Sequence, residues 1–179
     1  MTTAREALHS SASVEWYTPA LYIDAAREVM GAIDLDPASC DQANRIVQAS
    51  CYYTAADDGL RQRWQGRVWL NPPYGRGGQA RWSQRLIQEY EAGQVRSAIL
   101  LVDAATGARW FQPALFPRFA TCFKAGRLAF IHAETGKPQT SPTHYNAFVY
   151  LGQRPERFAE VFGVLGEVVL PHPPAGRLL

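Results

Sequence analysis

The stretch Trp69-Leu70-Asn71-Pro72-Pro73-Tyr74 closes a short apolar run that begins at Arg67. Two consecutive prolines cannot continue a hydrogen-bonded ladder, so the run predicts a strand that ends in a rigid turn. In an open α/β sheet, ligands bind at the carboxyl ends of the strands. The turn therefore predicts a site at one sheet edge. Its parts are the Asn71 side chain, the Pro72 carbonyl and the Tyr74 ring.

This turn suits an exocyclic amino group on a planar ring. The Asn71 side-chain oxygen and the Pro72 carbonyl can each accept one amino N–H. Stacking of a nucleobase on Tyr74 would contribute about 1–3 kcal/mol. Because the ring face does the stacking, we expect a protein with phenylalanine at position 74 to retain much of any activity that depends on this stacking. The structural alternative is a proline-capped strand that enters the glycine-rich loop 75–78.

Strand and helix patterns alternate on both sides of the turn. Thr18 and Pro19 suit the N-cap and first position of a helix that ends at Gly31. Further strands are predicted at 32–36, 67–70, 97–102, 119–123 and 147–151, and further helices at 78–93 and 106–115. This alternation predicts a mostly parallel, doubly wound α/β sheet. No helix separates the last two strands, which favours an antiparallel strand at one edge.

Length and composition fit one domain, expected over residues 14–170 with loose termini at 1–13 and 171–179. No apolar run is long enough to cross a membrane, and the start lacks signal-peptide features, so we expect a cytoplasmic protein of a bacterial or phage-infected cell. Three cysteines and four scattered histidines predict no metal site. The net charge of +2 says little about partners. We expect a monomer or weak dimer.

The Asn71–Tyr74 motif resembles the Asn/Asp-Pro-Pro-Tyr signature of amino-group methyltransferases. Its order with Tyr17-Thr18-Pro19, Asp34–Ser39, Asp57–Leu60 and Trp64 is similar to that of compact phage and prophage Dam-type DNA N-6-adenine methyltransferases. Gly126–Phe130 and Ser141-Pro142 also match. The resemblance implies a Rossmann-like fold, S-adenosylmethionine as cofactor and methylation of adenine in double-stranded DNA, in a phage or restriction-modification setting.

The same resemblance implies where the cofactor binds, although the usual Gly-x-Gly loop is absent. A carboxylate after the first strand would pair with the cofactor's ammonium or ribose, and the Tyr-Thr-Pro element would hold its methionine end at a helix N-terminus. Asp58 would accept from the adenine amino group. Each segment also has a structural alternative, a helix start or an acidic turn. The implied cofactor residues are Trp16, Tyr17, Thr18, Pro19, Asp34, Asp36, Pro37, Ala38 and Asp58.

Basic side chains in or near loops of the same expected edge could meet DNA phosphates, although each alone could be a plain surface charge. They are Arg76, Arg81, Lys124, Arg127, Lys137 and His144.

The implied reaction flips the target nucleotide into the pocket. Asn71, Pro72, Pro73 and Tyr74 form the catalytic set, and no residue need deprotonate the nitrogen before attack. Three alternatives stay open: an amino group of cytosine or RNA, a protein glutamine, and a non-enzymatic DNA-binding regulator. An intact motif argues against the regulator, and the lack of room for a separate recognition region argues against glutamine.

Overall fold

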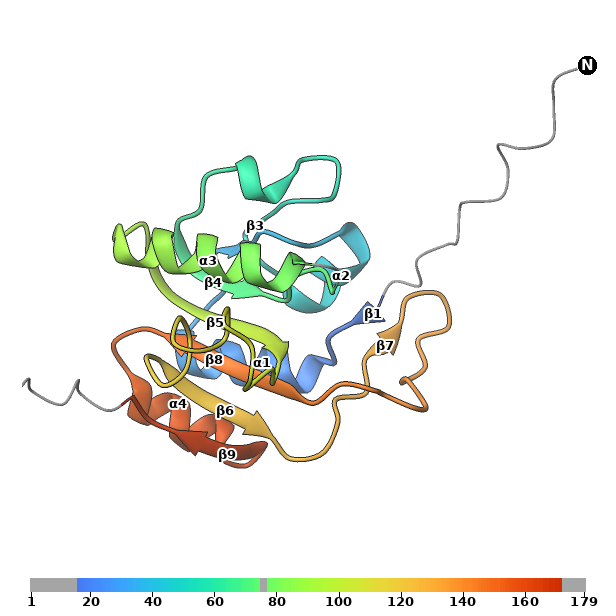
Figure 1. Ribbon diagram of the computed structural model, residues 1–179. Coiled ribbons are helices and arrows are strands. Elements are labelled where there is room, and N and C mark those ends of the chain that lie inside the picture. The colour runs from blue at the N-terminus through green and yellow to red at the C-terminus, as the bar shows by residue number, and fades with distance from the viewer. Residues whose placement is uncertain (1–15, 75–76, 172–179) are drawn as a thin grey trace, which may run out of the picture.

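The computed structural model of the protein describes residues 16–74 and 77–171. Its main sheet has the strand order β3-β2-β4-β5-β8-β6-β9 (Figure 1). Strands β3, β2, β4 and β5 are mutually parallel, whereas β8 runs antiparallel to both β5 and β6, and β9 runs antiparallel to β6. The strands are β2 (Leu35–Asp36), β3 (Cys51–Tyr52), β4 (Gly66–Leu70), β5 (Val95–Asp103), β6 (Ala120–Lys124), β8 (Asn146–Leu151) and β9 (Gly166–Val169).

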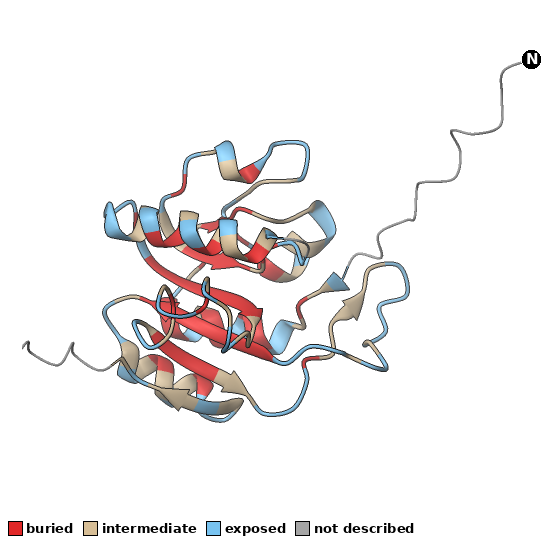
Figure 2. Ribbon diagram, in the orientation of Figure 1, coloured by how far each residue is buried: buried red, intermediate tan, exposed pale blue. Residues whose placement is uncertain are grey.

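Helices cover both faces of this sheet. Strand β5 shows the division, because Ile99 and Leu101 pack in one core cluster and Leu100 and Val102 in the other. The first cluster includes residues of α1 and α4, and the second includes residues of α3. Figure 2 shows the central strands buried between helices whose outer sides are exposed. The helices are α1 (Ala20–Met30), α2 (Asp41–Val47), α3 (Gly78–Glu91) and α4 (Pro155–Phe162), with a 3₁₀ turn η1 at Gly59–Arg61.

A separate two-stranded ribbon lies beyond the carboxyl ends of the central strands (Figure 1). It pairs β1 (Trp16–Tyr17) antiparallel with β7 (Ile131–His132). The ribbon brings the start of the described chain next to a loop more than a hundred residues later. It thereby adds a wall at the sheet edge where the motif turn lies.

Several expected elements are confirmed. The strand before the motif is β4, the run at 97–102 lies inside β5, and the helix at 78–93 is α3. An antiparallel strand does lie at one edge, because the edge strand β9 runs antiparallel to β6. The expected strand at 147–151 is also antiparallel, but as β8 it lies inside the sheet between β5 and β6. Two strands, β8 and β9, therefore run against the other five.

Two local predictions were wrong. Pro19, not Thr18, is the N-cap of α1, and it caps without a side-chain hydrogen bond. The Thr18 hydroxyl instead meets Asn71. The segment 106–115 forms turns rather than a helix, although Phe111 and Leu115 are fully buried. Pro113, which has no N–H to donate, interrupts the helical hydrogen-bond pattern there. No helix in the described part of the chain is long and apolar enough to span a membrane.

Candidate functional site

Two adjoining cavities open at the carboxyl ends of the parallel strands. The larger has a volume of about 540 Å³ and the smaller about 250 Å³. Three side chains, Trp16, Asn71 and Tyr74, line both cavities. Each lies where the strand order predicts a binding edge, because β1 adjoins this edge and the motif directly follows β4. The motif therefore stands between two spaces rather than at the floor of one.

Asn71 has one half of its amide engaged and the other half free. Its side-chain nitrogen donates to the Thr18 hydroxyl over 3.2 Å. Its side-chain oxygen is buried and has no hydrogen-bond partner. A buried acceptor without a donor costs free energy, about 1–3 kcal/mol. The Thr18 bond orients the amide, so the oxygen is the part of the Asn71 side chain that is left without a partner. Pro72 beside it is buried and Pro73 is exposed.

Tyr74 presents its ring but buries its hydroxyl end. The residue is 39% exposed, and its ring meets Phe130 and His144 edge-on at centroid distances of 5.9 and 6.2 Å. The phenol oxygen accepts a hydrogen bond from the Asn146 side chain over 3.2 Å. Burial around the hydroxyl raises the pKa of Tyr74, the Asp103 charge raises it further, and the Asn146 bond opposes both. The hydroxyl is thus neutral and anchored, which leaves the ring for contact with a ligand.

Asp36 supplies a buried carboxylate to the larger cavity. It ends β2, is 3% exposed, and accepts the Ala38 backbone N–H over 3.2 Å. Burial raises the pKa of Asp36 to about 6, with the hydrogen bonds at this turn opposing the shift. Pro37 and Ala38 line the same cavity. A carboxylate in such surroundings favours a ligand that brings a positive charge or hydroxyl donors.

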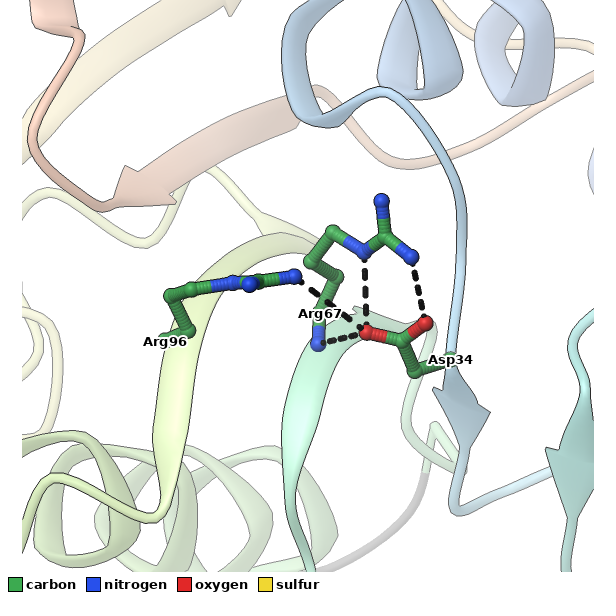
Figure 3. Close-up of polar contacts among 3 residues, drawn as sticks. All are labelled: Asp34, Arg67 and Arg96. Carbon is green, nitrogen blue, oxygen red and sulfur yellow. Dashed lines mark hydrogen bonds and ion pairs between the residues drawn. The ribbon is translucent and has the colours of Figure 1, made fainter.

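Asp34 is engaged elsewhere. It precedes β2 at the amino end, and its carboxylate accepts three hydrogen bonds from Arg67, at 2.8, 2.8 and 2.6 Å, with Arg96 at 3.9 Å (Figure 3). These bonds hold the pKa of Asp34 below its usual value. Asp34 does not line either cavity. The expected cofactor contact therefore has no geometric support at this residue.

Of the other residues expected to bind the cofactor, some line the larger cavity and others do not. Trp16, Tyr17 and Thr18 line the larger cavity, whereas Pro19 does not. Asp58 also lines it, with its carboxylate 3.3 Å from Arg61 and its backbone in the left-handed region at φ 51°. Trp16 is fixed by an edge-on contact with His132, with ring centroids 5.1 Å apart.

The basic residues expected to contact DNA differ in their positions, and of those in the described part of the chain His144 alone lines the smaller cavity. Arg127 lies over the Tyr145 ring at 4.8 Å, and Lys137 is exposed on the loop between two lining segments. Lys124 ends β6, and its ammonium donates to the Ala125 carbonyl. Arg81 is exposed on α3, and Arg76 lies outside the described residues. His144 instead lines the cavity, with Nδ1 3.5 Å from the Asp103 carboxylate.

Three polar residues at this edge were missed by sequence reasoning: Gln79, Asp103 and Asn146. The Gln79 amide nitrogen donates to the Asp103 carboxylate over 3.0 Å, and its oxygen accepts the Asp103 backbone N–H over 2.9 Å. Asn146 pairs with Asp103 in the register of β5 and β8. A signal existed, because Asp103 ends an apolar strand as Asp36 does, and Asn71 directly follows one. Within the described ranges, no group of three or more His, Cys, Asp or Glu side chains could hold a metal ion.

Comparison with known proteins adds a family to this geometry. The family model described as DNA N-6-adenine-methyltransferase (Dam) matches residues 6–158. A protein named DNA N-6-adenine-methyltransferase, from Escherichia phage T1, is 29% identical over 140 residues, which cover 68% of this chain. The chain spans 56% of the length of that phage protein. No solved protein structure matches the chain significantly.

Proposed function

The chain belongs to the DNA N-6-adenine-methyltransferase (Dam) family, and we propose that it transfers a methyl group from S-adenosylmethionine to the exocyclic amino group of adenine in double-stranded DNA. One observation carries the proposal: Asn71, whose side-chain oxygen is buried and has no partner, lines both cavities. A methyl donor on one side and an amino group on the other would meet at this atom.

The larger cavity would hold the cofactor. Asp36 would receive its ammonium or ribose hydroxyls, and Asp58 and Trp16 lie in the same lining. A bound positive charge would offset the burial that raises the pKa of Asp36 to about 6. S-adenosylmethionine supplies an electrophilic methyl group on sulfur. The residues present fit this cofactor, because the cavity combines a buried carboxylate with aromatic walls.

The smaller cavity would hold the target base. Aromatic and apolar side chains of Tyr74, Phe130 and Leu128 suit a flat ring, and polar groups stand among them. The Asn71 oxygen and the Pro72 carbonyl would accept the two amino hydrogens. These bonds weaken conjugation of the amino nitrogen with the ring and free its lone pair. Charge then develops on nitrogen during attack, and the acceptors stabilise it.

Placement accounts for the rest of the chemistry. The base must leave the duplex, at a cost of a few kcal/mol. Stacking on Tyr74 recovers about 1–3 kcal/mol of that cost. The nitrogen loses its proton after methyl transfer, when the proton has become acidic, so no base is needed before attack. The catalytic set is Asn71, Pro72, Pro73 and Tyr74, with orientation as its main contribution.

The fold supports a Rossmann-like methyltransferase assignment. Four parallel strands bring Asp36, Asn71 and Asp103 to one edge, where such sheets bind ligands. DNA would approach over the mouth of the smaller cavity, because the exposed Arg127 and Lys137 lie within two residues of the lining residues Leu128 and Gln139. Arg81 and Lys124 belong to the same edge, because α3 follows β4 and Lys124 ends a strand parallel to β5.

Methyl transfer from tritiated S-adenosylmethionine to unmethylated duplex DNA tests the proposal. Nucleoside analysis should find the label on the exocyclic nitrogen of adenine. Label on cytosine, on RNA or on a protein glutamine would move the activity to another amino acceptor. Tight cofactor binding without transfer to any of these acceptors would contradict the proposal.

A further inference from the structure

Asn146 is a buried amide at the first position of β8, in the wall of the smaller cavity. It is 1% exposed, and its side-chain nitrogen donates to the Tyr74 phenol oxygen over 3.2 Å. Its side-chain oxygen is buried and has no partner. A buried amide oxygen without a hydrogen-bond partner costs the fold free energy. Packing alone therefore does not explain asparagine at this position.

We propose that Asn146 is a positioning residue that holds the Tyr74 ring at the angle required to stack on the target base. The proposal rests on the proposed function, because it assigns the stacking partner to a base. It places a determinant of base capture in β8, well outside the Asn-Pro-Pro-Tyr motif.

Tyr74 needs an anchor beyond its own backbone. It follows two prolines, belongs to no helix or strand, and exposes 39% of its surface. Phe130 and His144 contact its ring in T-shaped arrangements, at interplanar angles of 75° and 61°, and neither contact holds the hydroxyl end of the side chain. The bond from Asn146 fixes the far end of the side chain. A ring held at its tip retains fewer orientations when the base arrives.

Asn146 is itself held by rigid structure. Its backbone pairs with Asp103 in the sheet. Asp103 in turn forms hydrogen bonds with both the nitrogen and the oxygen of the Gln79 side-chain amide. Gln79 lies in the first turn of α3, shortly after the motif. Sites built on strands and helices are placed more accurately than sites on loops. The chain of contacts therefore ties the loop that carries Tyr74 to the sheet through α3 and β8.

This arrangement changes the expected effect of phenylalanine at position 74. The ring face would remain, but the Asn146 nitrogen would lose its partner while still buried. The cost should appear in the use of DNA rather than in cofactor binding. We therefore expect Tyr74→Phe to impair DNA methylation by about 10-fold, the order expected when one buried hydrogen bond is lost.

A double-mutant cycle tests the coupling between the two residues. Tyr74→Phe, Asn146→Leu and the double variant are compared by kcat/KM for methyl transfer to unmethylated duplex DNA. Each single variant should lose about 10-fold, and the double variant should lose little more, because both remove the same bond. Cofactor affinity, measured by calorimetry, should remain near the wild-type value. Multiplied losses in the double variant, or parallel loss of cofactor affinity, would overturn the proposal.

Thr121→Val is the matched control. Thr121 is also fully buried in the sheet, on β6, and its hydroxyl donates to the Phe119 carbonyl over 3.0 Å. This variant removes a buried hydrogen bond away from Tyr74 and should show no coupling with Tyr74→Phe. Coupling of similar size would mean that the cycle reports general destabilisation, and the positioning role would be rejected.

A spectroscopic measurement separates this proposal from the activity itself. In protein labelled with ¹³C-tyrosine, the Tyr74 ring signals are identified by their loss in Tyr74→Phe. Asn146→Leu should shift these signals and speed ring rotation in the cofactor-free protein. Unchanged signals would overturn the positioning role, whether or not the wild type methylates DNA. Absence of methyl transfer by the wild type would instead count against the proposed function.

Discussion

The Thr18 hydroxyl accepts the side-chain N–H of Asn71 over 3.2 Å, and this bond decides which end of the Asn71 amide is free. With its nitrogen engaged, the amide offers only its oxygen, which is buried and unpartnered. An amino group on a substrate supplies the missing donor. The start of α1 and the end of β4 therefore cooperate in presenting one acceptor.

Replacing Asn71 should affect turnover far more than cofactor binding. Asn71→Ala removes an acceptor whose bond strengthens as charge develops on the amino nitrogen. We expect turnover to fall by about 100-fold or more. Tritiated methyl transfer measures turnover, and calorimetry measures cofactor affinity. Thr18→Val, which removes only the orienting bond, should give a smaller loss. Equal turnover of Asn71→Ala and wild type would exclude the assigned role.

Cofactor affinity should depend on pH through Asp36. In the free protein burial raises its pKa to about 6, so the carboxyl is largely protonated at lower pH. A ligand that needs the carboxylate must displace that proton. The dissociation constant should therefore fall as the pH rises from about 5 to about 7. Asp36→Asn should bind more weakly, by about 1–3 kcal/mol, and should lose this part of the pH dependence.

Ionisation of Asp36 should strengthen cofactor binding but lower the stability of the cofactor-free fold. Its pKa in the fold lies above the value of 3.8 taken for the unfolded chain, so ionising Asp36 disfavours the folded state. The cost appears as the pH rises through this interval and is complete above it. Without cofactor at neutral pH, Asp36→Asn should be at least as stable as the wild type in denaturant unfolding. Marked destabilisation of the variant would contradict the assigned burial cost.

Gly78 should be indispensable for the shape of the motif turn. A Cβ at this position would lie 2.5 Å from the Pro73 carbonyl oxygen, closer than real contacts allow. Gly78→Ala must therefore displace the turn, and we expect about 10-fold or greater loss of kcat, as small misplacements at reacting centres produce. Gly107→Ala is the control, because a Cβ there meets nothing within 4 Å. Equal activity of both variants would show that the turn adapts.

Arg127 and Lys137 should contribute phosphate contacts. Replacing both with alanine should lower DNA affinity and reduce the slope of log affinity against log salt by about 2, roughly one per contact. Arg96 and Arg157 provide a control of equal charge. Arg96 lies near the start of β5, and Arg157 follows the end of β8. Because β8 runs antiparallel to β5, both residues lie at the sheet edge opposite the site. If the slope of log affinity against log salt changed equally in both double variants, Arg127 and Lys137 would not be specific phosphate contacts.

The Asp34–Arg67 pair should stabilise the fold without serving the reaction. Its bonds lower the pKa of Asp34, so the stabilisation is present above the unfolded pKa and is lost as the pH falls through the lower folded value. Arg67→Met should cost about 1–3 kcal/mol of unfolding free energy at neutral pH. The difference from wild type should shrink in acid. Turnover per folded molecule should not change in Arg67→Met. A large loss of turnover would instead mean that the Asp34–Arg67 pair contributes to the reaction.

Local signals in the sequence predict the centre of this site well. The apolar run before Asn71 and the prolines after it define both a strand and its end, so β4 and the motif turn follow from adjacent residues. The run at 97–102 predicts β5 for the same reason. In each case the decisive interactions lie within a few residues of the pattern.

Non-local interactions account for the errors. The position of β8 depends on pairing with β5 and β6, which are distant in sequence, so its own apolar pattern could not place it. Asp34 and Asp36 look equivalent in the sequence. They differ because Arg67, from the neighbouring strand, reaches the first, whereas burial at the strand end isolates the second. Asn146 was missed because its partner Tyr74 lies 72 residues earlier.

Because Trp16, Asn71 and Tyr74 face both cavities, the two binding spaces form one continuous target for a linked ligand. A bisubstrate compound that joins an adenine ring to a cofactor fragment through a short linker would span the common wall. Once one half is bound, the second half is held near its cavity at high effective concentration. Such an inhibitor would bind far more tightly than either half alone.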